Sequence, residues 1–317
     1  MSRALCAALV LAASIGCGGN LAAQEFSIIA PAAPGGGWDQ TARAMQAALQ
    51  ANGIAKNVQV MNIPGAGGTV GLAQFVAQST GNPNAFILGG YGMVAPIIAN
   101  KTAVSLKDVT PIARLTGENE VIVVPPSSPF KTLADLVAAL KENPGAVSWA
   151  GGSAGGIDHV AASLIAKAVG VDPTKVNYVA FSGGGEALSA ILGGQVSVGI
   201  SGTGEFEALI RAGKLRALGV TAATRIPTVD APTLKEQGVD VDFQNWRMVA
   251  AAPGLTPAQK LAVTEAMTRM VQSEDWKKTL AAKGWQDTFL AGEAFDRFLA
   301  AEIAQTETVL KDLGLAK

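Results

Sequence analysis

Along most of the chain, short apolar runs alternate with segments in which apolar residues recur at helical spacing. The first apolar run, residues 26–30, predicts a buried strand. It is followed by a loop at 31–38 and by a helix at 41–50, for which Asp39 is the expected N-cap residue. Further strands are predicted at 58–61, 86–88, 121–124, 147–150, 178–181, 196–200, 218–221 and 247–252, and most of them precede a glycine-containing turn and a helix. Beyond residue 252 the pattern is mainly helical, with helices expected at 257–273, 275–283 and 293–313.

Repeated strand–helix units of this kind predict an α/β fold with open, mostly parallel sheets. A chain of 317 residues exceeds the roughly 250–300 residues at which one hydrophobic core usually divides into two. The short strands at 121–124 and 247–252 are the predicted crossovers between two lobes. The first lobe would comprise residues 24–124 and 249–317, and the second lobe residues 125–248.

The N-terminus has the pattern of an export signal. Arg3 precedes an apolar run at 4–15, which is too short for a membrane-spanning helix of about 20 residues. The following small residues predict a secretory leader at 1–23, with cleavage after Ala23, and hence a periplasmic protein. An imperfect lipoprotein box at 14–17 is the alternative, in which Cys17 would carry a lipid anchor. Both cysteines, Cys6 and Cys17, lie in this leader, so the mature chain would form no disulfide.

The composition excludes several classes of protein. A hydrophobic fraction of 49% and a charged fraction of 15% exclude intrinsic disorder. A formal net charge of −1 argues against a nucleic-acid-binding protein, because such proteins carry an excess of basic residues. The single histidine excludes metal sites that need two or three His ligands. The unusual feature is glycine, with 37 of 317 residues, or about 12% against a usual share of about 7%.

Glycines are concentrated in six turns that follow predicted strands, at the edge of the sheet where α/β proteins bind ligands. These glycine-rich turns are at 34–38, 64–68, 89–92, 151–156, 182–185 and 201–204. Neither a P-loop motif nor a dinucleotide-binding fingerprint is present, so a nucleotide cofactor is not expected. Residues 151–155 match the G-x-S-x-G pattern of serine hydrolases, with Ser153 as the nucleophile. However, the only histidine, His159, lies six residues later on the same predicted helix, where it is poorly placed to act as the base. Ser153 as a hydroxyl donor to a ligand, and His159 as a packing, capping or ligand-contacting group, are the simpler interpretations.

A third interpretation is the capture of an anion by backbone groups. The N-terminus of a helix presents unpaired N–H groups and a partial positive charge, and glycine allows close approach of the anion. Arg247 could add a fixed charge or form a structural ion pair, and Trp38, Trp149 and Trp246 could wall the site or pack in the core. The predicted ligand-binding residues are Gly35, Gly36, Gly37, Trp38, Asp39, Gly65, Ala66, Gly67, Gly68, Tyr91, Ser153, Ala154, Gly155, Asp158, His159, Ser182, Gly183, Gly184, Ser201, Thr203, Trp246 and Arg247.

Several motifs together resemble one protein family. They include Pro34-Gly35-Gly36-Gly37-Trp38-Asp39 after the first strand, and they continue at 62–71, 155–159, 193–196, 212–218, 245–247 and 252–255. In this order they resemble the extracytoplasmic solute receptors of tripartite tricarboxylate transporters, the Bug family. The resemblance covers essentially all of the mature chain, and the Pro-Gly-Gly-Gly-Trp-Asp segment looks closer to the tricarboxylate-type receptors than to the amino-acid-binding members of the family.

The resemblance implies a two-lobed periplasmic binding protein of type II-like architecture, joined by two crossover strands and closing on its ligand as a Venus flytrap does. It implies binding of a small di- or tricarboxylate such as citrate, without a cofactor and without catalysis. It further implies delivery of that ligand to a membrane transporter with one large and one small subunit, and we expect the receptor to be a monomer. An exported hydrolase that uses Ser153, and a protein that presents its ligand to a membrane sensor, remain as alternatives.

Overall fold

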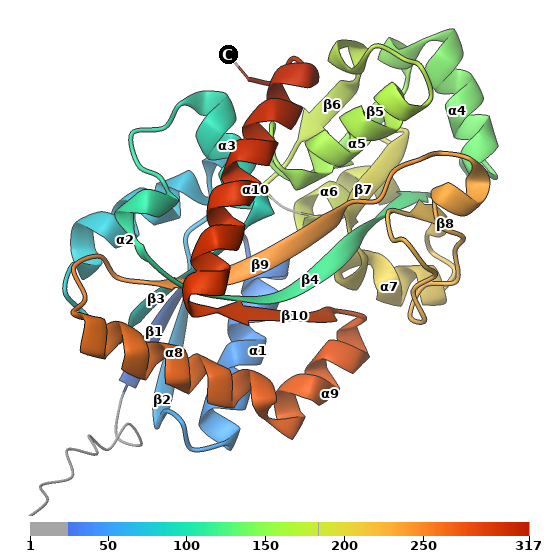
Figure 1. Ribbon diagram of the computed structural model, residues 1–317. Helices are drawn as coiled ribbons and strands as arrows, with labels where there is room; N and C mark the ends of the chain where they lie inside the picture. The colour runs from blue at the N-terminus through green and yellow to red at the C-terminus, as the bar shows by residue number, and fades with distance from the viewer. Residues whose placement is uncertain (1–24, 183, 317) are drawn as a thin grey trace, which may run out of the picture.

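The computed structural model describes residues 25–182 and 184–316 (Figure 1). The predicted leader, with Cys6 and Cys17, and the predicted site residue Gly183 lie outside the described residues. In the described part of the chain, no helix is both long enough and apolar enough to cross a bilayer.

Helices and strands alternate along the chain as the sequence pattern predicts. The strands are β1 (Glu25–Ala30), β2 (Asn57–Asn62), β3 (Ala85–Gly90), β4 (Thr110–Val124), β5 (Ser148–Gly151), β6 (Asn177–Ala180), β7 (Val198–Gly202), β8 (Arg216–Val220), β9 (Gln244–Ala251) and β10 (Gln286–Ala291). The α-helices are α1 (Gly37–Ala51), α2 (Thr69–Ser79), α3 (Tyr91–Asn100), α4 (Leu133–Glu142), α5 (Ile157–Ala168), α6 (Gly184–Leu192), α7 (Thr203–Arg211), α8 (Pro257–Gln272), α9 (Glu274–Lys283) and α10 (Gly292–Asp312).

The strands follow the order β2-β1-β3-β9-β4-β7-β5-β6, and β8 and β10 also pair with β4. Pairing is parallel between β1 and its neighbours β2 and β3, and between β5 and its neighbours β6 and β7. Every pair that includes β4 or β9 is antiparallel. The expectation of a mostly parallel sheet is therefore correct for the strand–helix repeats and wrong for the strands that join them.

Strand β4 is much longer than the predicted segment 121–124. Its residues from Thr110 to Asn119 pair with β9 and β10, and those from Glu120 onward pair with β7 and β8. Figure 1 shows β4 and β9 running side by side across the centre of the molecule. We call β1–β3, β9, β10 and the first part of β4 the first half of the sheet, and β5–β8 with the end of β4 the second half. The exact lobe limits, at 124/125 and 248/249, stay predictions.

Each half of the sheet is covered by apolar side chains on both faces, as expected for sheets built from strand–helix units. In β1, Phe26 and Ile28 belong to one buried cluster and Ile29 to another, because successive side chains of a strand point to opposite faces. The second half is packed in the same way, between a cluster that contains Trp149 and one that contains Phe206. This arrangement fixes the strand ends, where the glycine-rich turns begin.

Two local predictions are wrong. Strand β10 lies within a region expected to be mainly helical, and its half-buried residues show no strict alternation of burial that would have indicated a strand. Asp39 is not the N-cap of the first helix, because α1 begins two residues earlier, with Gly36 in the N-cap position. Asp39 is instead the third residue of α1, from which its carboxylate reaches back to the preceding turn.

Candidate functional site

A cavity of about 580 Å³, including its open mouth, lies between the two halves of the sheet. All six glycine-rich turns contribute to its wall, and so does strand β9. The lining residues are Ala32, Gly36, Gly37, Trp38, Gly67, Gly92, Gly152, Ser153, Gly156, Ile157, Asp158, Ser182, Gly184, Ser201, Glu205, Asn245 and Arg247. Its position at the carboxyl ends of β1, β5 and β7 is where open α/β sheets bind ligands.

The turn before α1 is fixed by its own acidic residue. The Asp39 carboxylate accepts a hydrogen bond from the N–H of Gly35 at 2.8 Å and also accepts from Arg43 and Asn62. Burial acts to raise the pKa of Asp39, but the hydrogen bonds from Arg43, Gly35 and Asn62 outweigh it and lower the pKa. Asp39 thus shapes the loop without lining the cavity.

The turn before α5 is held in a similar way. The Asp158 carboxylate accepts from the N–H of Gly152, and Nδ1 of His159 accepts from the N–H of Gly155 at 3.0 Å. The His159 ring stacks on Tyr178, with 4.3 Å between ring centroids, and burial lowers the pKa of His159 to about 4. His159 is therefore a neutral capping and packing group at physiological pH.

Hydrogen bonds connect the two halves across the cavity. Oε1 of Glu205, on α7, accepts from the N–H of Gly37 at the start of α1, at 3.0 Å. The hydroxyl oxygen of Ser153 accepts from the N–H of Gly67, also at 3.0 Å. Both donors are backbone groups of the first half and both acceptors are side chains of the second half, so these contacts join the two halves across the cavity.

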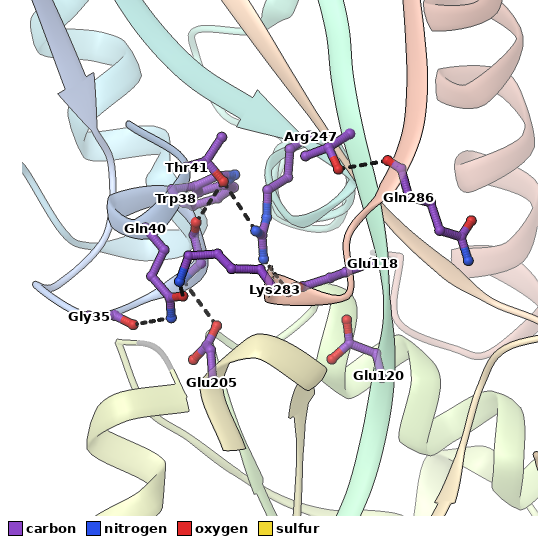
Figure 2. A network of polar contacts seen from close by, with 12 residues as sticks. Gly35, Trp38, Gln40, Thr41, Glu118, Glu120, Glu205, Arg247, Lys283 and Gln286 are labelled. Carbon is purple, nitrogen blue, oxygen red and sulfur yellow. Dashed lines mark hydrogen bonds and ion pairs between the residues drawn. The ribbon is translucent and has the colours of Figure 1, made fainter. Parts of the chain in front are cut away.

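Arg247, from β9, is buried beneath the cavity with only 2% of its surface exposed. Its guanidinium group forms an ion pair with Glu118 of β4 and donates to the hydroxyl of Thr41 at 3.1 Å (Figure 2). The group also lies over the ring of Trp285, at 5.0 Å from the ring centroid. Arg247 therefore both lines the cavity and forms a structural ion pair.

Four acidic side chains lie close together near this arginine, and we call them the acidic group: Glu118, Glu120, Asp158 and Glu205. Burial and the charges of Asp158 and Glu118 raise the pKa of Glu120 well above its usual value. Burial, together with the charge of Glu118, raises the pKa of Asp158 to about 6 against the hydrogen bond from Gly152. Burial, then the charges of Glu118 and Asp158, raise the pKa of Glu205 to about 8. Within the described residues, no group of three or more His, Cys, Asp or Glu side chains is arranged to hold a metal ion.

Sequence comparison with known proteins finds a matching family. Residues 41–315 match the sequence profile described as "Tripartite tricarboxylate transporter family receptor". The chain belongs to this receptor family. A UPF0065 protein of Agrobacterium vitis is 30% identical over 236 residues, which cover 73% of this chain and 66% of that protein, just under two thirds of its length.

Solved structures of related receptors share the fold. The periplasmic binding protein BugD superposes with a TM-score of 0.83 at 22% identity, over 92% of this chain and 98% of BugD. MatC from Rhodopseudomonas palustris, solved with bound malate, superposes with a TM-score of 0.78 at 24% identity, over 90% of this chain and 98% of MatC. The chain thus has the two-lobed fold of the Bug-type periplasmic receptors. Proteins of this family are solute receptors rather than enzymes.

The structure brings part of the predicted site of this receptor to the cavity wall. Ten predicted residues line it: Gly36, Gly37, Trp38, Gly67, Ser153, Asp158, Ser182, Gly184, Ser201 and Arg247. Predicted residues that lie in or beside the same turns without lining it are Gly35, Asp39, Gly68, Gly155, His159 and Thr203. Gly65, Ala66 and Ala154 line a neighbouring depression that also includes Ser153 and Ser182.

The predicted aromatic wall is reduced to Trp38. Tyr91 and Trp246 line a different cavity next to α10, because Tyr91 packs edge-on against Phe243 and the Trp246 indole N–H donates to Glu302. Trp149 is fully buried in the core of the second half. The structure therefore does not place Tyr91 or Trp246 where the sequence interpretation expected a ligand.

The sequence interpretation missed the acidic residues Glu118, Glu120 and Glu205. The sequence did contain a signal for Glu118 and Glu120, which directly precede the predicted apolar strand at 121–124. They are two residues apart in β4 and therefore share one face of that strand. Glu205 follows the predicted site residue Thr203 by two positions. Asn245 and Gly92, which line the cavity, were missed as well.

Replacing Ser153 with alanine is expected to lower the free energy of unfolding of the receptor by about 0.5–1.5 kcal/mol, since one hydrogen bond between the two halves is lost. Urea unfolding measures this difference. Ser163→Ala is the matched control, because Ser163 is buried on α5 and its hydroxyl has no partner among the described residues. Any ester hydrolysis that disappears specifically in Ser153→Ala would instead support the hydrolase alternative.

Proposed function

We propose that this receptor captures a small di- or tricarboxylate in the cavity between its halves and delivers it to a tripartite tricarboxylate membrane transporter. The observation that carries the proposal is the cavity itself. Six glycine-rich turns and the starts of several helices converge there, in a chain that belongs to a family of solute receptors. Backbone N–H groups at helix starts are suited to binding carboxylates.

The malate bound by MatC supports the choice of a small carboxylate. A citrate-like ligand and a transporter with one large and one small subunit are the finer parts of the proposal. They rest on the family's description as transporter receptors. Closure would be driven by the higher affinity of the closed form for the ligand.

Isothermal titration calorimetry of the purified protein with malate, succinate, glutarate, adipate and citrate tests this function. We expect at least one of these acids to bind with a dissociation constant in the micromolar range or below, with glucose as the negative control. The Ser153→Ala variant should bind that acid more weakly, whereas Ser163→Ala should bind it as the unmodified receptor does.

Two results would contradict the proposal. One is the absence of binding by every carboxylate tested, and the other is saturable binding of glucose in their place.

Delivery to a transporter is tested separately, by capture of membrane proteins on the immobilised receptor with and without the acid. Recovery of a sensor protein instead of transporter subunits would favour the signalling alternative.

A further inference from the structure

The first turn of α1 is capped from the opposite side of the cavity. The N-cap residue of this helix, Gly36, has no side chain, and the N–H of Gly37 donates instead to Oε1 of Glu205 at 3.0 Å. Glu205 belongs to α7 in the second half, 168 positions further along the chain. Gly37 and Glu205 both line the cavity. A carboxyl group of the chain itself therefore occupies a helix start that faces the cavity.

Acidic residues at the starts of two other helices hold their own turns. Asp39, the third residue of α1, accepts from the N–H of Gly35, and Asp158, in the first turn of α5, accepts from the N–H of Gly152. Glu205 has the same position in α7 that Asp39 has in α1, but it accepts from a helix of the other half. The two local hydrogen bonds are kept when the halves move apart, whereas the hydrogen bond of Glu205 is broken.

Glycines leave the space that the Glu205 carboxyl group fills. A carbon at the Cβ position of Gly184 would lie 2.0 Å from Oε2 of Glu205, and one at Gly37 would lie 3.2 Å from Oε1. The first of these distances is far inside van der Waals contact, so a larger residue at 184 would exclude the carboxyl group from this position. A space that fits a carboxyl group beside a helix start also suits the carboxylate of a ligand.

Glu205 is held in this space by few contacts. Its Oε1 accepts from Gly37, and its Oε2 is buried and accepts no hydrogen bond from the described residues. By contrast, the Asp39 carboxylate accepts from Gly35, Arg43 and Asn62. Displacing Glu205 breaks one hydrogen bond of Gly37, and an incoming carboxylate restores that bond.

We propose that Glu205 is an internal substitute for the carboxylate of the ligand. Before the ligand binds, Glu205 occupies the N–H of Gly37 and joins α7 to α1. The ligand displaces it and takes over the hydrogen bond, so the ligand gains at α1 only the difference between its own bond and that of Glu205. Glu205 thereby determines affinity. This inference rests on the proposed function and assigns a role in it to one residue.

Two replacements separate the hydrogen bond from the charge of Glu205. Glu205→Asp keeps a carboxyl group, but its side chain is one methylene shorter and should not reach Gly37. Glu205→Gln keeps the length and an acceptor oxygen without the charge. With no acid added, NMR should show the Gly37 amide proton exchanging about three- to tenfold faster in Glu205→Asp than in the unmodified receptor, as expected for the loss of one hydrogen bond. Glu205→Gln should change the exchange less.

The affinity for a carboxylate should follow the same hydrogen bond. In calorimetry with malate, succinate and citrate, the acid that binds the unmodified receptor should bind Glu205→Asp about three- to tenfold more tightly. The gain for Glu205→Gln should be smaller. Glu207→Asp is the matched control, because Glu207 lies on the same helix, pairs with Arg211 and does not line the cavity. Titration of the unmodified receptor with the same acid should also shift the NMR signal of the Glu205 carboxyl carbon.

Four results would overturn the role of Glu205. They are unchanged exchange of the Gly37 amide in Glu205→Asp, weaker binding of the acid by that variant, a larger gain in affinity for Glu205→Gln than for Glu205→Asp, and an unshifted carboxyl signal of Glu205 on titration. The third result would mean that charge repulsion, not displacement, limits binding. The fourth needs no variant, so the test does not depend on the folding of Glu205→Asp.

The failure of the proposed function would give a different result. Faster exchange of the Gly37 amide in Glu205→Asp, with no acid bound by any variant, would support the internal contact of Glu205 and count against the carboxylate receptor.

Discussion

Replacing Arg247 with methionine is expected to lower the free energy of unfolding by about 3–5 kcal/mol, because the change leaves the buried Glu118 carboxylate without its partner. Methionine has a similar length and no charge, so little volume is lost. The effect should be large because the nearby Glu120, Asp158 and Glu205 are also acidic, so no other positive group among the described residues replaces Arg247 beside the Glu118 carboxylate.

A double-mutant cycle measures this interaction. Guanidinium unfolding is compared for the unmodified protein, Arg247→Met, Glu118→Gln and the double variant. The double variant should recover a large part of the lost stability, since no buried charge is then left unpaired. Arg225→Met is the matched control. Its pair with Glu236 is solvent-exposed, and exposed pairs contribute about 0–1 kcal/mol. Equal losses for Arg247→Met and Arg225→Met would contradict the buried ion pair.

The excess of glycine indicated the turns that line the cavity, and the structure shows a second reason for these glycines. The sequence interpretation assigned these residues to the binding of an external anion. In the structure, several of them lie against carboxylates of the chain itself. Glu205 lies against Gly37 and Gly184, and Asp158 against Gly152. A carbon at the Cβ position of Gly202 would meet Glu118.

The order of helices and strands was predictable because each strand–helix unit is a local pattern. The length of β4 was not, since its residues from Thr110 to Asn119 acquire partners only from β9 and β10, far away in the chain. Strand β10 was missed for the same reason: its pairing with β4 is long-range, and its own residues show no alternation.

The site was predictable where it depends on local geometry and was missed where it depends on charge brought together by folding. The turns around Gly37, Gly67 and Ser153 follow from glycines between a strand and a helix. The acidic group combines residues from β4, α5 and α7, and only the crossing of β4 between the two halves brings them together. Tyr91 and Trp246 line a different cavity, next to α10, because an aromatic residue beside a ligand turn can face either side of the sheet.

The acidic group also predicts how stability depends on pH. A carboxyl whose pKa is raised on folding keeps its proton in the folded state after the unfolded state has released it. The unfolded state then binds fewer protons, so stability falls as pH rises from the unfolded pKa to the folded pKa. For Glu205 this window runs from its ordinary pKa of 4.5 to about 8. Asp158 acts in the same direction between 3.8 and about 6.

His159 has the opposite effect over part of this range. Its pKa falls from 6.5 to about 4 on folding, so the unfolded state binds the extra proton and stability rises with pH between these values. Above pH 6.5 this contribution is complete, and Asp158 has passed most of its titration. The decline in stability between pH 6.5 and 8 is therefore assigned to Glu205, and the raised pKa of Glu120 acts in the same direction.

Glu205→Gln removes the carboxyl that titrates in this range. The decline in the free energy of unfolding between pH 6.5 and 8 should become shallower by up to about 1.4 kcal/mol per pH unit, or about 2 kcal/mol over the interval. Urea unfolding at several pH values measures the slope, and Glu207→Gln should leave it unchanged. An identical slope in Glu205→Gln would contradict the raised pKa.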